Sequence, residues 1–227
     1  MRVGDGDRAG EALAGGGDLA VAQALTGAGQ ASEAAPPTLL LASTSPQRRA
    51  ILEQLRIPFE AVRPSFVEDD RPDADPVSLV RAHARGKARA ALALADGRPV
   101  LGVDTAVACE GVVYGKPAGA AEAAAALRAL AGRSHVVVSG LALVGPGWEV
   151  LEHEVTRVWF RSLSERDIDR YVASGEWEGR AGAYAIQGLG ASLVERVEGD
   201  YLNVVGLPAA LLVRLLAERF PGVYGFG

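Results

Sequence analysis

Short apolar runs alternate with stretches of helical periodicity in the first half of the chain. Leu39–Ala42 and Pro99–Ala108 are rich in Leu and Val and have the length of buried strands. Helical spacing follows Pro46 and Pro76, each of which comes directly after a Ser or an Asp. Such a pair combines a good N-cap with a good first helical residue. Strands and helices are therefore expected to alternate in this half.

The second half of the chain shows strands joined by tight turns. His135–Val144 and Trp148–Arg161 flank a Gly-Pro-Gly turn and predict an antiparallel hairpin. The glycine-rich stretch Gly179–Gly190 is predicted as a loop to which Tyr184 and Ile186 give strand character. Tyr201–Val205 is predicted as a short strand, and Pro208–Phe220 is predicted as the closing helix. Together the two halves predict an α/β protein, with a mixed twisted sheet and flanking helices.

The composition excludes several classes of protein. The net charge is −5, with 28 acidic and 23 basic residues, and this argues against a general nucleic-acid binder. No apolar run approaches the ~18 residues of a membrane span. The single cysteine, Cys109, excludes an internal disulfide and a multi-cysteine zinc site. His83, His135 and His153 match no metal-ligand spacing, so we expect them to be structural or surface residues.

Residues 1–37 differ in composition from the rest of the chain. They are rich in Ala and Gly, and they lack the basic start and apolar centre of a secretion signal. We therefore expect a flexible leader over residues 1–37 and a single domain over residues 38–227. A cytoplasmic location is the default expectation for such a chain.

The start of the first predicted helix gathers groups that suit an anion. Ser43 and Ser45 precede the helix and Arg48 lies in its first turn. The free N–H groups of a helix start also attract negative charge. The alternative is an ordinary capped helix with solvated arginines, and these residues alone do not decide between the two interpretations.

Acidic residues at or near predicted strands are candidates for metal binding or for positioning water. Asp104 interrupts an apolar run, and a buried carboxylate is unfavourable unless it is paired or bound to a cation. Its position alone therefore selects Asp104, although an Asp that hydrogen-bonds a turn is the alternative. Glu68 and Asp69 follow the strand predicted at Phe59–Val62, and without further context a solvated acidic loop is the simpler interpretation.

Four motifs are distributed over nearly the whole chain after residue 37. The first is Ser-x-Ser-Pro-x-Arg, and the second is a lysine before an alanine at Lys87. The third is Asp104-Thr105 followed by Gly-Lys-Pro, and the fourth is Ala-Gly-Ala-Tyr-x-Ile-Gln-Gly around Gln187. Together they resemble the Maf family of nucleoside triphosphate pyrophosphatases. The resemblance implies an elongated, two-lobed Maf/ITPase-like fold with a central cleft that holds the nucleotide.

The resemblance also implies an activity and a set of site residues. The reaction would be hydrolysis of a nucleoside triphosphate to the monophosphate and pyrophosphate. Glu68 and Asp104 would bind a divalent cation, Mg²⁺ or Mn²⁺, and Asp104 is also the candidate general base; their two roles stay open. The catalytic residues would be Asp104, Glu68, Lys87 and Lys116. The substrate-binding residues would be Ser43, Ser45, Gln47, Arg48, Thr105 and Gln187.

Three of these positions are associated with substrate choice in the family. Thr105 and Gln187 match the branch that prefers dTTP and UTP, whereas Gln47 stands where that branch usually has Arg. We therefore expect hydrolysis of dTTP and UTP. Modified pyrimidine triphosphates, CTP, 7-methyl-GTP, a smaller phosphate ester, or a non-catalytic role in regulating cell division are the alternatives. The family also allows a homodimer, and no membrane or nucleic-acid partner is expected.

Overall fold

The computed structural model describes residues 36–69 and 74–227. Within this part, Pro36–Gly227 forms one compact unit. The leader predicted over residues 1–37 falls almost wholly outside the described residues. The domain boundary therefore stays a prediction.

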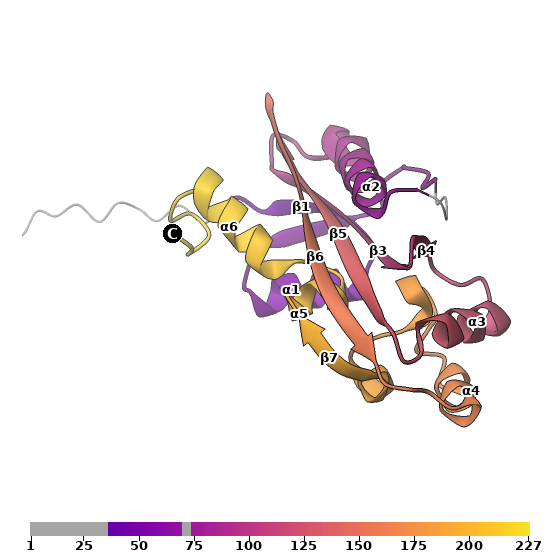
Figure 1. Ribbon diagram of the computed structural model, residues 1–227. Coiled ribbons are helices and arrows are strands. Elements are labelled where there is room, and N and C mark those ends of the chain that lie inside the picture. Colours follow the sequence, from indigo (N-terminus) through magenta and orange to yellow (C-terminus); the bar gives the residue numbers. More distant parts are fainter. Residues whose placement is uncertain (1–35, 70–73) are drawn as a thin grey trace, which may run out of the picture. The chain divides into compact units, whose positions relative to one another are not determined.

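Seven strands form a single mixed sheet, in the order β2-β1-β3-β5-β6-β7 with β4 beside β3 (Figure 1). Their bounds are β1 (Leu39–Ala42), β2 (Phe59–Val62), β3 (Val100–Cys109), β4 (Val112–Tyr114), β5 (Ser134–Gly145), β6 (Trp148–Phe160) and β7 (Val194–Glu198). β1 pairs in parallel with β2 and β3, and the other pairs are antiparallel. The predicted mixed α/β sheet and the predicted β5–β6 hairpin are confirmed.

Helices lie on both faces of this sheet. The α-helices are α1 (Pro46–Gln54), α2 (Pro76–Ala91), α3 (Ala120–Leu130), α4 (Glu165–Ala173), α5 (Tyr201–Val205) and α6 (Ala209–Arg219). Short 3₁₀ helices are η1 (Leu92–Leu94), η2 (Ala181–Ala183) and η3 (Gly188–Leu193). None of the described helices is both long and apolar enough to span a membrane. The elongated, two-lobed outline stays a prediction.

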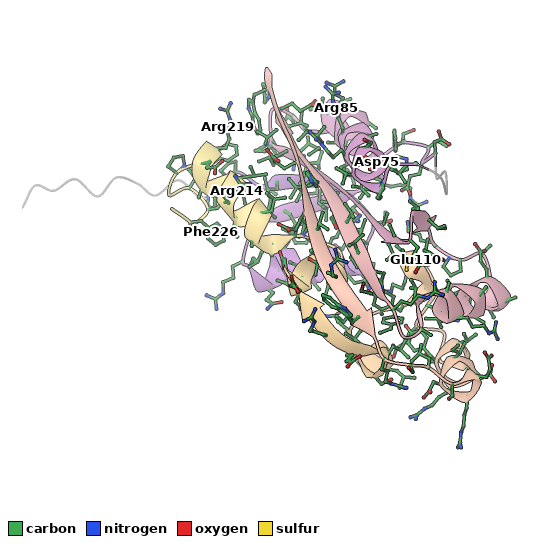
Figure 2. The ribbon with its side chains drawn as sticks, in the orientation of Figure 1. Asp75, Arg85, Glu110, Arg214, Arg219 and Phe226 are labelled. Carbon is green, nitrogen blue, oxygen red and sulfur yellow. The ribbon has the colours of Figure 1, made fainter. Side chains whose placement is uncertain are left out.

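The two N-caps expected before prolines are present. Ser45 accepts a hydrogen bond from the backbone N–H of Arg48 and begins α1. Asp75 accepts one from Ser78 at 2.8 Å and begins α2, where Figure 2 labels it. Both caps satisfy N–H groups that would otherwise have no partner at a helix start.

Alternation along β1 divides the core between the two faces. Leu39 and Leu41 belong to a cluster that includes residues of α1 and α6, whereas Leu40 and Ala42 pack in a cluster with the alanines of α2. Figure 1 shows α2 on the opposite side of the sheet from α1 and α6. Successive residues of β3 therefore also face different helices.

Glycines let α2 lie directly on the sheet. A Cβ atom at Gly102 in β3 would lie 2.2 Å from the carbonyl oxygen of Ala84, and one at Gly140 in β5 would lie 2.2 Å from that of Val80. A larger residue at either position would push the helix away. This close approach brings the polar side chains of α2 within reach of β3.

One local prediction is wrong. Tyr201–Val205 is the helix α5 rather than a strand, because Asp200 caps it by accepting from the backbone N–H groups of Leu202 and Asn203. The loop predicted at Gly179–Gly190 consists of turns and 3₁₀ helices, and the strand character of Tyr184 and Ile186 is not realised, since Gly182 and Ala183 adopt left-handed backbone conformations. A strand requires extended backbone at these positions.

Candidate active site

A cavity of about 490 Å³ opens where β1 ends. The pairing of β1 with β3 stops at Leu41 and Leu101, while β3 continues to Cys109 with only antiparallel partners. The middle of β3 therefore has a free edge beyond the carboxyl end of a parallel strand, which is where ligands bind in open α/β sheets. All ten site residues predicted from the sequence line this cavity: Ser43, Ser45, Gln47, Arg48, Glu68, Lys87, Asp104, Thr105, Lys116 and Gln187.

Two carboxylates and a buried lysine form the centre of the cavity. Lys87 Nζ lies 2.6 Å from Asp104 Oδ1 and 2.7 Å from Glu68 Oε1. Lys87 and Asp104 are only 6% and 7% exposed, so this pair is shielded from solvent, whereas the Glu68 side chain is 29% exposed. Glu68, and not its neighbour Asp69, supplies the second carboxylate.

His83 is the residue that the sequence interpretation missed. It lies buried on α2, one turn before Lys87, and its Nδ1 is 3.1 Å from Asp104 Oδ2. The backbone N–H of Asp69 points to His83 Nε2 at 3.2 Å, which assigns the proton to Nδ1 and makes His83 a donor to Asp104. The i, i+4 spacing of His83 and Lys87 was the available signal, because it places both side chains on one helix face.

Asp104 is held in its ionised form by these contacts. Burial by itself would raise the pKa of Asp104. The hydrogen bond from His83 and the positive charges of Lys87 and Arg48 together outweigh burial, so that the pKa lies below its ordinary value. Asp104 is therefore a carboxylate at neutral pH.

A divalent cation fits this donor set. Glu68, His83 and Asp104 each place a potential ligand atom within 4.8 Å of the others. Both ring nitrogens of His83 are used by protein contacts, which leaves no free lone pair on the ring. The carboxylates keep lone pairs beyond those that meet Lys87, so they are the available ligands. Oxygen donors of this kind are the ones that Mg²⁺ and Mn²⁺ prefer.

Arg48 contacts β3 on the face opposite to the one that carries Asp104. It donates to Gly206 O at 2.9 Å, to Ser43 Oγ at 3.0 Å and to Thr105 Oγ1 at 3.2 Å. Burial lowers the pKa of Arg48, while the negative charges of Asp104 and Glu68 act in the opposite sense. Arg48 is thus fixed in the cavity wall, and the interpretation of a solvated arginine does not hold for it.

The hydroxyl of Thr105 contacts three groups of the protein. It lies 2.9 Å from Ser139 Oγ, accepts from Arg48 and approaches Gly206 O at 3.4 Å. The hydroxyl is therefore occupied in fixing Arg48. Gln47 is also held, because its Oε1 accepts from the Ser45 hydroxyl at 3.1 Å.

The late glycine-rich loop forms another part of the wall. Gln187 lines the cavity with an exposed side chain. Its loop is anchored by Glu176, which accepts from the N–H groups of Leu189 at 3.0 Å and Gly190 at 3.1 Å. The loop can therefore present the Gln187 amide in a defined place.

A second cavity of about 410 Å³ adjoins the first. The two share several lining residues, among them Glu68, Asp104 and Lys116. Much of the remaining wall of the second cavity is apolar and comes from α2, β3, β4 and α3. Lys116 is 57% exposed and lies 3.9 Å from Glu68 Oε2, at the boundary between the two cavities.

Fold and cavity together are those of an α/β protein whose cleft suits an anionic ligand, and comparison with known proteins agrees. Residues 38–219 match the family described as Maf-like protein. The chain is 46% identical over 187 residues to the dTTP/UTP pyrophosphatase of Nitratidesulfovibrio vulgaris, covering 80% of this chain and 87% of that one. It is 44% identical over 191 residues to the dTTP/UTP pyrophosphatase of Deinococcus radiodurans, covering 84% and 96%. The chain therefore belongs to the Maf-like protein family, which confirms the resemblance.

Proposed function

We propose that this protein hydrolyses dTTP and UTP to the nucleoside monophosphate and pyrophosphate. The curated relatives described above carry the name of this activity. The observation that supports it most is that the ionised Asp104 lies in a cavity lined by several basic side chains. A protein that only binds nucleotides has no need of a buried carboxylate, because that charge repels the ligand unless a cation intervenes.

The residues divide into three groups by what they can do. Arg48, Lys116 and the start of α1 bind phosphate oxygens. Glu68 and Asp104 would hold the divalent cation, Mg²⁺ or Mn²⁺, which when bound neutralises phosphate charge. Lys87 and His83 fix the Asp104 carboxylate from two sides.

Asp104 is the best placed group to take a proton from the attacking water. Lys87 binds one of its oxygens and His83 the other, and each oxygen still has a lone pair. A general base of this kind contributes about 10²–10⁴-fold to the rate. Its lowered pKa keeps it unprotonated at neutral pH, at the expense of basicity.

Gln187 is the residue that we expect to read the base. Its amide offers both a donor and an acceptor, as the edge of a pyrimidine requires. Thr105 would act indirectly, since its hydroxyl fixes Arg48. The homodimer, the cytoplasmic location and the absence of nucleic-acid binding stay predictions.

The direct test is pyrophosphate release from dTTP, UTP, CTP, 7-methyl-GTP and ITP in the presence of Mg²⁺ or Mn²⁺. We expect dTTP and UTP to be the preferred substrates and Asp104→Asn to be inactive. Asp96→Asn is the matched control, because Asp96 is exposed and lines neither cavity. Preference for 7-methyl-GTP would overturn the proposed substrate specificity. Nucleotide binding without cleavage would favour the alternative of a non-catalytic regulator of cell division.

A further inference from the structure

Arg180 carries a guanidinium that lines the main cavity and that the described part of the chain leaves without a hydrogen-bond acceptor. It comes directly before η2 and lines the cavity together with Lys116 and Gln187. Its Nε is buried without a hydrogen-bond partner, and its guanidinium has no acceptor among the described residues. Because a buried N–H without an acceptor is unfavourable, a ligand is the natural source of the missing partner.

The backbone places Arg180 beside the loop that carries Lys116. Gly182 adopts a φ of +68° and its N–H donates to the carbonyl of Gly115 at 3.1 Å. A Cβ atom at Gly182 would lie 2.7 Å from the side chain of Val107, so this loop rests directly on β3. The two basic residues therefore come from loops that are joined to each other.

The remaining cations of the cavity are largely committed to protein partners. Lys87 lies between two carboxylates, and Arg48 donates to three protein oxygens. Lys116 has a single long contact with Glu68 within the described part of the chain. Arg63 also lines the cavity, but it is exposed, and water satisfies an exposed guanidinium. Arg180 and Lys116 thus retain the capacity to bind further negative charge.

We propose that Arg180, together with Lys116, binds the β and γ phosphates of the substrate and holds the pyrophosphate leaving group. This inference rests on the proposed pyrophosphatase function. A planar guanidinium donates two parallel hydrogen bonds to a phosphate, and the leaving group carries most of the negative charge that the site must balance. Arg180 would therefore bind the β and γ phosphates of the substrate and not its nucleoside.

The test is a calorimetric titration of inorganic pyrophosphate and, separately, of dTMP into wild type and Arg180→Gln with Mg²⁺ present. We expect the Kd of pyrophosphate to rise about 10- to 100-fold, the range for a charge-assisted hydrogen bond, with the Kd of dTMP unchanged. Arg180→Lys should recover part of the loss. Arg166→Gln, on the exposed side of α4, should bind pyrophosphate as wild type does.

Two results would overturn the inference. Equal affinity of wild type and Arg180→Gln for pyrophosphate would mean that Arg180 does not contact the β and γ phosphates. Equal weakening of pyrophosphate and dTMP would indicate a general role in shaping the loop. If wild type cleaves dTTP in the same preparation, either result removes only the role of Arg180. If wild type neither cleaves nor binds, the proposed function fails as well.

Discussion

Lys87→Met removes the cation that holds two carboxylates together and should destabilise the protein strongly. The two side chains have similar length, so the main loss is the charge. Lys87 Nζ contacts Asp104 at 2.6 Å and Glu68 at 2.7 Å, and the substitution leaves both carboxylates without this cation. Breaking a buried ion pair costs about 3–5 kcal/mol. Because the Glu68 side chain is 29% exposed, we expect a value near the lower end, about 3 kcal/mol.

The same reasoning predicts that a divalent cation rescues this variant. With the ammonium gone, the two carboxylates become a stronger cation site, and a ligand that binds only the folded state stabilises it by about 2.7 kcal/mol at 100 times its Kd. Urea unfolding should therefore show a large loss of stability in EDTA and a partial recovery in Mn²⁺. Wild type should gain less from Mn²⁺ than the variant.

Lys116→Met is the matched control for this experiment. It removes the same charge, but from an exposed side chain that lies 3.9 Å from Glu68. An exposed pair contributes about 0–1 kcal/mol, so its stability should stay near that of wild type. The reasoning is refuted if Lys87→Met unfolds like Lys116→Met, or if Mn²⁺ stabilises wild type and Lys87→Met equally.

Three further predictions concern acid stability, substrate affinity and the metal. Burial lowers the pKa of His135 from 6.5 to about 4, so between these pH values the unfolded chain binds a proton that the folded chain excludes. As the pH falls from 6.5 to about 4, the free energy of unfolding of wild type should therefore decrease by up to about 3 kcal/mol more than that of His135→Gln. The same pH dependence of urea unfolding in both proteins would contradict this. Gln47→Arg adds a cation to the cavity wall and should lower the KM for dTTP about 3- to 10-fold at low salt, with less effect at high salt; an unchanged KM would show that Gln47 does not face the substrate. Dialysis against EDTA should abolish turnover and Mg²⁺ or Mn²⁺ should restore it, whereas full activity in EDTA would exclude the proposed cation.

Local signals were sufficient to predict the framework of the site. The leucine run of β1, the Ser-Pro pair at the start of α1 and the polar interruption of β3 at Asp104 are all short-range features. Each feature favours one secondary structure for the segment that contains it, and the structure has that secondary structure there. This is why β1, α1 and β3 could be placed from the sequence alone.

The wrong strand prediction at Tyr201–Val205 has one local and one tertiary cause. Tyr201–Val205 has strand-forming residues, but Asp200 caps it as a helix, and the buried amide of Asn203 donates to Val137 O and Thr156 Oγ1. Non-local contacts of this kind override local propensity.

The same limit applies to two side chains of the site. His83 acquires its role from Asp104, which lies 21 positions away along the chain. Arg180 can be recognised only once its missing acceptor is seen. The i, i+4 spacing of His83 and Lys87 indicates a shared helix face, but no motif shows which carboxylate His83 meets or that Arg180 lacks an acceptor among the described residues.

The most direct test of the central claim is the identity of the bond that the protein cleaves. The protein should convert dTTP to dTMP and pyrophosphate in a single step. In water labelled with a heavy oxygen isotope, the label should enter dTMP and not pyrophosphate, as attack at the α phosphorus requires. Release of dTDP and inorganic phosphate, or label in the pyrophosphate, would contradict the account.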